Sequence, residues 1–139
     1  MEVTVRGDAR GFRQEISDGN HNLVSDEPLD SGGTDAGPDP YGLLLAALGA
    51  CTSMTLGLYA KRKGWPLDTV TIKLRHSRIY AKDCEECETS DGMISRIDRD
   101  ISVTGDLTDE QRQALLAIAD KCPVHRTLTS EFSIRSRLT

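Results

Sequence analysis

Alternation of apolar and polar residues along the chain predicts its strands. The short runs EVTVR and GFRQEI lie on either side of the turn-like stretch GDAR and predict a hairpin, and HNLVSDEP predicts a third short strand. Two longer runs, DTVTIKLRHSRIY and ISRIDRDISVTG, predict two strands of a sheet with one solvated face. Their apolar positions are Val70, Ile72, Leu74, Ile97, Ile101 and Val103. The run EFSIRSRL predicts a closing strand.

Two segments have helical signals instead. The first predicted helix runs from about Pro40, a residue suited to a first helical turn, to about Lys63, where GWP ends it. The second begins at Thr108, which has the spacing of a capping box with Gln111. Pro123 interrupts this helix and can begin a further short helical segment, PVHRTL. The order of elements predicts an α+β protein.

The first predicted helix is apolar on nearly every side. A surface helix of a monomer should show one polar face, but leucines and Met54 point in nearly every direction here. The stretch 43–60 reaches about 18 residues, the lower limit for a membrane span, but hydroxyl residues and glycines dilute it. We therefore expect a buried helix rather than a membrane span, covered on its second side by another copy of the chain in a homodimer.

Composition narrows the classes of function. The 139 residues suit one domain spanning 1–139, and 37% hydrophobic with 28% charged residues indicate a globular chain. The net charge of -5 argues against nucleic acid or an anionic membrane as a partner. No leader segment is visible, so a cytoplasmic, reducing compartment is expected. In such a compartment, the four cysteines are expected to be catalytic, redox-active or metal-binding rather than a structural framework.

Cys51 has two interpretations. A free cysteine among Leu, Ala and Gly is often a small core residue with an inert thiol. Alternatively it is a reactive thiol, and then it needs a nearby cation, because an unperturbed thiol is only a few per cent thiolate at neutral pH. Arg6, Arg10 and Arg13 of the first hairpin are the candidate cations.

The remaining cysteines allow several arrangements. Cys122 would be the N-cap of the segment that Pro123 opens, where N–H groups favour a thiolate, or it is a packed end of the second helix. Cys84 and Cys87 form a C-x-x-C pair in a polar connection, so they are a solvated hairpin end, a local disulfide, or two ligands of a Cys3His zinc site with Cys122 and His125. A Cys51–His125 hydrolase pair lacks an orienting third residue, and SGGTDAGPDP lacks the lysine and spacing of a phosphate loop.

Two segments resemble the OsmC/Ohr family (osmotically inducible protein C and organic hydroperoxide resistance protein). GPDPYGLLLAALGACTSMTL resembles the Pro-rich entry to the central helix with the family's first cysteine, and DKCPVH resembles the segment with the second. The order of elements is also similar, and the C-x-x-C pair points to the OsmC-like branch. The resemblance implies an OsmC-like fold, with antiparallel sheets packed around a long buried central helix in an intertwined homodimer.

The resemblance also implies a function, that of a thiol-dependent peroxidase. Cys51 would be the peroxidatic cysteine that organic hydroperoxide or hydrogen peroxide oxidises to a sulfenic acid, and Cys122 the resolving cysteine that forms a Cys51–Cys122 disulfide. A dithiol reductant, such as a lipoylated protein, would regenerate both thiols, without a cofactor. Alternatives are a non-enzymatic OsmC-like protein that senses redox state or binds a ligand and, further, a zinc-stabilised protein.

An arginine of the first hairpin activates the thiolate in the family, and Arg13 is the best match, with Arg10 second. The family glutamate that holds this arginine, nine or ten residues before the first cysteine, is absent: those positions are Gly42 and Tyr41. Asp39 is the nearest carboxylate. We therefore expect either that Asp39 substitutes for the glutamate or that the arginine is held less firmly.

Overall fold

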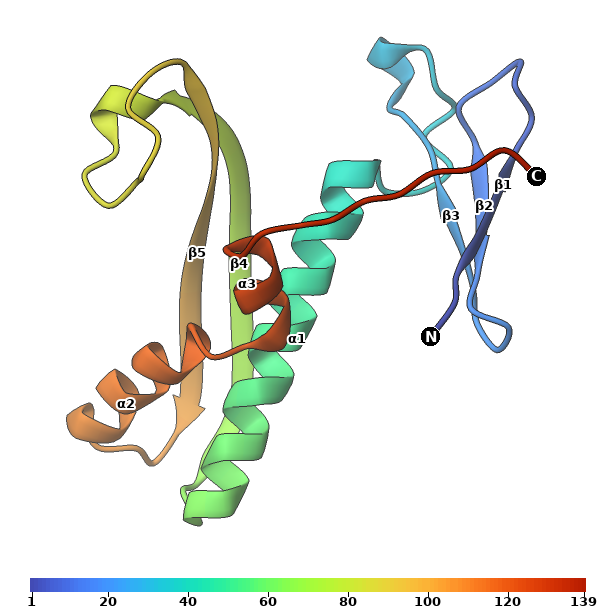
Figure 1. Cartoon of the computed structure of the whole chain (residues 1–139). Helices are drawn as coiled ribbons and strands as arrows, with labels where there is room; N and C mark the ends of the chain where they lie inside the picture. Colours follow the sequence, from blue (N-terminus) through green and yellow to red (C-terminus); the bar gives the residue numbers. More distant parts are fainter. The chain divides into compact units, whose positions relative to one another are not determined.

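The computed structural model describes residues 1–139, which form two compact units, Met1–Ala46 and Ala47–Thr139 (Figure 1). The chain is α+β, with antiparallel sheets and one long helix, as predicted. That the whole chain acts as one domain stays a prediction.

The first unit is built on a three-stranded antiparallel sheet. Its strands lie in the order β1-β2-β3, and their bounds are β1 Thr4–Gly7, β2 Gln14–Ser17 and β3 Asn22–Ser25. The three short strands predicted from the sequence are therefore confirmed. A 3₁₀ turn, η1 (Leu29–Ser31), follows. The buried carboxylate of Asp26 orders this loop by accepting hydrogen bonds from the backbone N–H groups of Glu27, Thr34 and Ala36.

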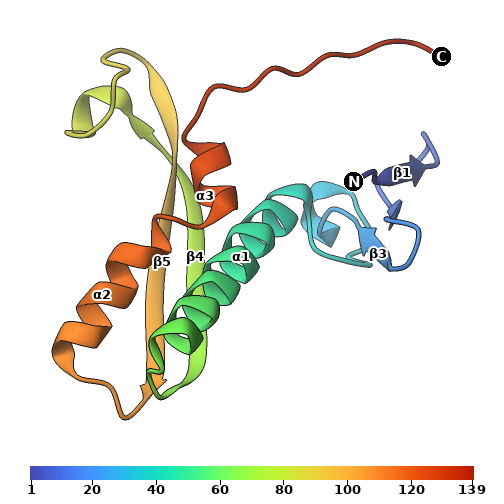
Figure 2. The same ribbon diagram turned by 60° about the horizontal axis from the view of Figure 1, so that its bottom comes forward.

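The second unit is organised on a long antiparallel hairpin. Its two strands are β4 (Leu67–Tyr80) and β5 (Met93–Gly105), with the short turn η2 (Ala81–Asp83) between them. The helices are α1 (Pro40–Lys63), which begins in the first unit, α2 (Asp109–Ala119) and α3 (Pro123–Leu128). The two long predicted strands and the predicted helices are confirmed here, and Thr108 and Gln111 form the predicted capping box. Figure 2 shows α1 running along the hairpin, with α2 beside the end of β5.

The core of the second unit lies where α1 meets α2. Leu56 and Ala60 of α1 pack with Leu115 and Ala119 of α2, and all four are at most 2% exposed. The strand residues against this cluster include Leu67, Val70, Ile101 and Val103. Val70, Ile101 and Val103 belong to the apolar face predicted from the sequence, so that face is the one that packs, and Leu67 joins it across the irregularity between Leu67 and Thr69.

Helix α1 is buried along one side only. Its buried residues, Leu48, Gly49, Thr52, Leu56 and Ala60, follow the spacing of one helical face. On another face Met54 and Leu58 are 73% and 50% exposed. By length and composition alone α1 could cross a membrane, but the core helix of a soluble protein passes the same test. The apolar exposed face fits the predicted homodimer, which stays a prediction.

The closing strand predicted from EFSIRSRL is wrong for this chain. Residues 131–139 have no regular structure and are exposed throughout. Alternation gives a segment the side chains of a strand, but a strand also needs a neighbour for its N–H and C=O groups. No strand of this chain pairs with the segment.

Candidate functional site

The structure brings Cys51 and Cys122 together within the second unit. Cys51 lies in the middle of α1 and Cys122 at the N-cap of α3. Both are free cysteines, and their side chains hydrogen-bond to each other. Cys122 is fully buried, whereas Cys51 is half-buried. Two thiols far apart in the sequence are therefore in contact without being bonded.

Local sequence explains how Cys122 reaches this place. Helix α2 ends at Ala119 with Asp120 as its C-cap, and the N–H of Cys122 still bonds to the carbonyl oxygen of Ala119. Pro123 is the first residue of α3, where its fixed φ and missing N–H are tolerated. The chain therefore turns sharply at Cys122 and directs its side chain at α1.

The surroundings shift the pKa values of the two site cysteines in opposite directions. Burial raises the pKa of Cys51, and the hydrogen bond with Cys122 raises it further. Burial also raises the pKa of Cys122, but the hydrogen bonds from Cys51, the backbone of His125 and the Thr52 side chain, with a smaller one from the backbone of Val124, outweigh burial and leave that pKa below its ordinary value. The shared hydrogen bond therefore raises the pKa of Cys51 and lowers the pKa of Cys122.

Arg99 is a site residue that the sequence analysis missed. Its guanidinium donates to the hydroxyl oxygen of Thr52 at 2.9 Å and to the carbonyl oxygen of Ala119 at 3.3 Å. It also pairs with Asp120 at 2.9 Å and lies 3.4 Å from the ring of His125. Its side chain is only 11% exposed.

A signal for Arg99 was present in the alternation of β5. Arg99 is in phase with Ile97, Ile101 and Val103, the residues assigned to the apolar face. An arginine at a core position needs partners for its charge and donors. A charged residue that alternates with the apolar residues of a strand, as Arg99 does, therefore indicates a buried polar site.

Cys51 is reached from an open, shallow hollow of about 410 Å³. The hollow lies on the exposed face of α1 and is almost entirely apolar in lining. Its residues are Ala47, Ala50, Cys51, Met54, Thr55, Leu58 and Pro123. A small molecule with an apolar body can thus approach Cys51, whereas Cys122 lies behind it.

The candidate activating arginines are held on their own hairpin in the first unit. Arg13 pairs with Glu15 at 3.1 Å, and Arg10 pairs with Asp8. That either guanidinium acts on Cys51 stays a prediction. Asp39 caps α1, because its carboxylate accepts the N–H of Gly42 at 2.6 Å.

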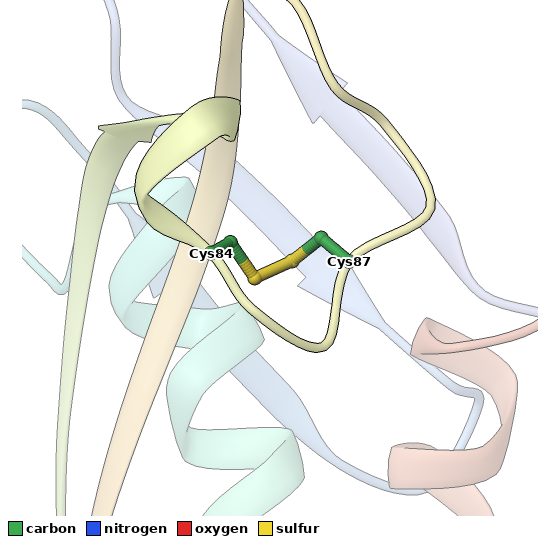
Figure 3. The surroundings of a disulfide bond; sticks show 2 residues. All are labelled: Cys84 and Cys87. Atoms are coloured by element: carbon green, nitrogen blue, oxygen red, sulfur yellow. A yellow bond between two sulfur atoms is a disulfide. The ribbon is translucent and has the colours of Figure 1, made fainter.

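Cys84 and Cys87 form a disulfide with a Cα–Cα distance of 5.5 Å (Figure 3). The bond closes a small loop between η2 and β5. The proposed Cys3His zinc site is therefore not formed: two of its sulfurs are bonded to each other, and Cys122 contacts Cys51. The ring of His125 faces Arg99 and Asp120, which gives no support to a Cys51–His125 hydrolase pair.

Comparisons with known proteins agree with this architecture. An OsmC-like protein from Mycoplasma pneumoniae has a TM-score of 0.71 at 18% identity, covering 91% of this chain and 85% of that one. An organic hydroperoxide resistance protein OsmC from Legionella pneumophila has a TM-score of 0.66 at 24% identity, covering 92% and 88%. The organic hydroperoxide resistance protein OhrB of Bacillus subtilis has a TM-score of 0.63 at 23% identity, covering 92% and 89%.

A search of curated proteins finds no match. The sequence model of the OsmC-like protein family, in contrast, matches residues 32–137, which include all four cysteines and every helix. The fold, the arrangement of the two free thiols and this match lead to one assignment: the chain belongs to the OsmC-like protein family.

Proposed function

We propose that this protein is a thiol-dependent peroxidase that reduces organic hydroperoxides or hydrogen peroxide. The observation that carries the proposal is the contact between the free thiols of Cys51 and Cys122, with Cys51 open to an apolar hollow. Family membership and structural neighbours named organic hydroperoxide resistance proteins support a peroxide-related role.

Oxidation begins at Cys51, the more accessible sulfur. Its thiolate attacks one oxygen of the peroxide, so that an S–O bond forms while the O–O bond breaks. The leaving oxygen takes up a proton and departs as an alcohol or water. Sulfur loses two electrons and becomes a sulfenic acid.

Resolution uses Cys122. Its thiolate attacks the sulfur of oxidised Cys51, an S–S bond forms, and the S–O bond breaks. The hydroxide takes up a proton and leaves as water. The lowered pKa of Cys122 suits this step, because the attacking group must be a thiolate. A dithiol reductant, such as a lipoylated protein, then supplies two electrons and two protons by thiol–disulfide exchange.

The first step needs a cation beside Cys51, since burial and its bond to Cys122 raise the pKa of that thiol. Arg13 is the proposed source, with Arg10 as the alternative. A homodimer would cover the exposed apolar face of α1 and narrow the hollow into a site for the substrate. We place this soluble protein in the cytoplasm, where a dithiol reductant is available.

Dithiol-dependent consumption of several peroxides tests the function. We expect Cys51→Ser to reduce consumption at least about 10³-fold, because the nucleophile is lost. Cys122→Ser should oxidise once and stop at a sulfenic acid that a nucleophilic trap detects by mass. The Cys84→Ser/Cys87→Ser variant is the control and should turn over normally. Undiminished consumption by Cys51→Ser would exclude this mechanism.

A second candidate is a redox sensor without fast turnover. Two observations favour it. The Asp39 carboxylate, the nearest substitute for the missing family glutamate, caps α1 by accepting the N–H of Gly42. The pKa of Cys51 is also raised. A sensor would form the Cys51–Cys122 disulfide with peroxide but would not consume further peroxide when a dithiol is supplied.

A further inference from the structure

Arg99 is a nearly buried cation that the proposed peroxidase reaction does not yet use. Its hydrogen bonds join three elements: Thr52 of α1, the end of α2 at Ala119 and Asp120, and His125 of α3. Cys122 lies in the turn between α2 and α3. Arg99 therefore ties the segment that carries Cys122 to the helix that carries Cys51.

Thr52 connects this cation to the sulfur. Its hydroxyl oxygen accepts a hydrogen bond from Arg99 at 2.9 Å, and Thr52 is fully buried. The hydroxyl donates its single proton to the carbonyl oxygen of Leu48 at 2.7 Å, and when Cys122 ionises the same proton can turn to its sulfur, with which Thr52 also interacts. With Arg99 as donor to the oxygen, the hydroxyl stays a donor, and its O–H bond is polarised further by the charge.

We propose that Arg99 is a positioning residue for the Cys51–Cys122 pair, acting through Thr52 to stabilise Cys122 as the thiolate that attacks oxidised Cys51. The attack of Cys122 on oxidised Cys51 rests on the proposed function, whereas the stabilisation of a Cys122 thiolate does not. No hydrogen bond of Arg99 reaches either sulfur, so Arg99 acts through its neighbours.

Other charged and titratable groups also lie around Cys122, and the test must separate their effects on its pKa from the effect of Arg99. Cys51 faces it from α1, His125 from α3, and Asp120 precedes it by two residues and pairs with Arg99. The carboxylate of Asp120 opposes a thiolate, and Arg99 offsets that carboxylate. Removal of Arg99 should therefore leave Cys122 with a nearby negative charge and a weaker hydroxyl donor.

Titration of Cys122 alone provides a measurement that needs no peroxide. In the full chain carrying Cys51→Ser, Cys84→Ser and Cys87→Ser, the ultraviolet absorbance of the thiolate against pH gives the pKa of Cys122. We expect Arg99→Gln to raise that pKa and to lower the thiolate fraction near neutral pH about tenfold. Arg99→Lys should restore part of the effect, because it keeps the charge with fewer donors.

Arg75→Gln is the matched control. Arg75 lies on the same hairpin, and its ion pair with Asp100 is exposed on both sides. This variant should leave the titration unchanged. A folded Arg99→Gln protein with an unshifted Cys122 titration would overturn the proposal, and so would an equal shift in Arg75→Gln.

Thr52→Val supplies a second variant in case Arg99→Gln does not fold. It removes the hydroxyl at nearly constant volume, so the pKa of Cys122 should rise, and Thr52→Ser should restore it. An unchanged pKa in Thr52→Val would exclude the connection through Thr52.

The kinetic part is measured with Cys51 present. After one equivalent of peroxide, Arg99→Gln should form the Cys51–Cys122 disulfide about tenfold more slowly, while the rate of Cys51 oxidation is unchanged. The Cys51 sulfenic acid would then accumulate and be trapped. If peroxide oxidises no cysteine, the proposed function fails while the titration result stands.

Discussion

The two cysteine pairs of this protein differ in almost every physical respect. Cys84 and Cys87 are three residues apart, lie in the loop between β4 and β5 as a buried and a half-buried residue, and are bonded to each other. Cys51 and Cys122 come from different helices, contact each other in the interior, and remain free thiols. The first pair owes its contact to the short chain between its members, and the second owes it to the packing of α1 against the α2–α3 turn.

This difference shows why spacing in the sequence is a poor guide to which thiols react. The C-x-x-C pair has the more recognisable motif, yet its two sulfurs are bonded to each other and leave no thiol to ionise. The distant pair has no local motif, yet burial, a hydroxyl, backbone N–H groups and Arg99 surround it. The environment, not the spacing, prepares a cysteine for chemistry.

The largest expected effect concerns stability in the oxidised state. A Cys51–Cys122 disulfide would close a loop of roughly 70 residues and raise the free energy of unfolding by about 4 kcal/mol, against about 2 kcal/mol for the short Cys84–Cys87 loop. Urea unfolding of oxidised and reduced samples measures both gains. The Cys84→Ser/Cys87→Ser variant reports the gain from the Cys51–Cys122 disulfide, and the Cys51→Ser/Cys122→Ser variant reports the gain from the Cys84–Cys87 disulfide. Equal gains in the two variants would contradict the comparison.

Packing near the two pairs should differ by somewhat less. Leu56 of α1 is 0% exposed in the core, so Leu56→Ala should lower the free energy of unfolding by about 3 kcal/mol. Met93, at the hairpin end beside the disulfide loop, is 41% exposed, and Met93→Ala should cost below about 1 kcal/mol. Chemical denaturation of both variants checks this, and similar losses would show that the hairpin end is packed as tightly as the core.

The smallest effect is a dependence on pH of opposite sign for the two site cysteines. The lowered pKa of Cys122 contributes stability that is present above the ordinary value of 9.0 and is lost as pH falls through the folded-state pKa. The raised pKa of Cys51 contributes stability that is present below 9.0 and is lost as pH rises through its folded-state pKa.

Variants with one site cysteine separate these contributions. In the Cys84→Ser/Cys87→Ser background, Cys51→Ser leaves Cys122 with a serine hydroxyl as donor in place of the Cys51 thiol. The free energy of unfolding of this variant should rise with alkaline pH relative to the protein lacking both site cysteines. Cys122→Ser leaves Cys51 alone, and its free energy of unfolding should fall over the alkaline range. The same sign for both would show that their surroundings do not differ as described.

Much of the fold followed from local pattern. The bounds of α1, the capping box at Thr108 and the short helix opened by Pro123 were all predicted, because each depends on residues near in sequence. The strand over EFSIRSRL failed, because pairing needs a neighbour that alternation cannot supply. Arg99 was missed for a related reason: its partners lie on three other elements.

The sequence by itself determined the family resemblance, the candidate thiols and every element but the closing strand, since helix signals, turn residues and alternation are short-range properties of the chain. Only the tertiary structure decided that Cys122 meets Cys51, that Cys84 and Cys87 are bonded to each other, and that Arg99 is buried beside Thr52. The physical reason is that burial and hydrogen bonding, which set the pKa of a thiol, arise from groups brought together by packing rather than by order along the chain.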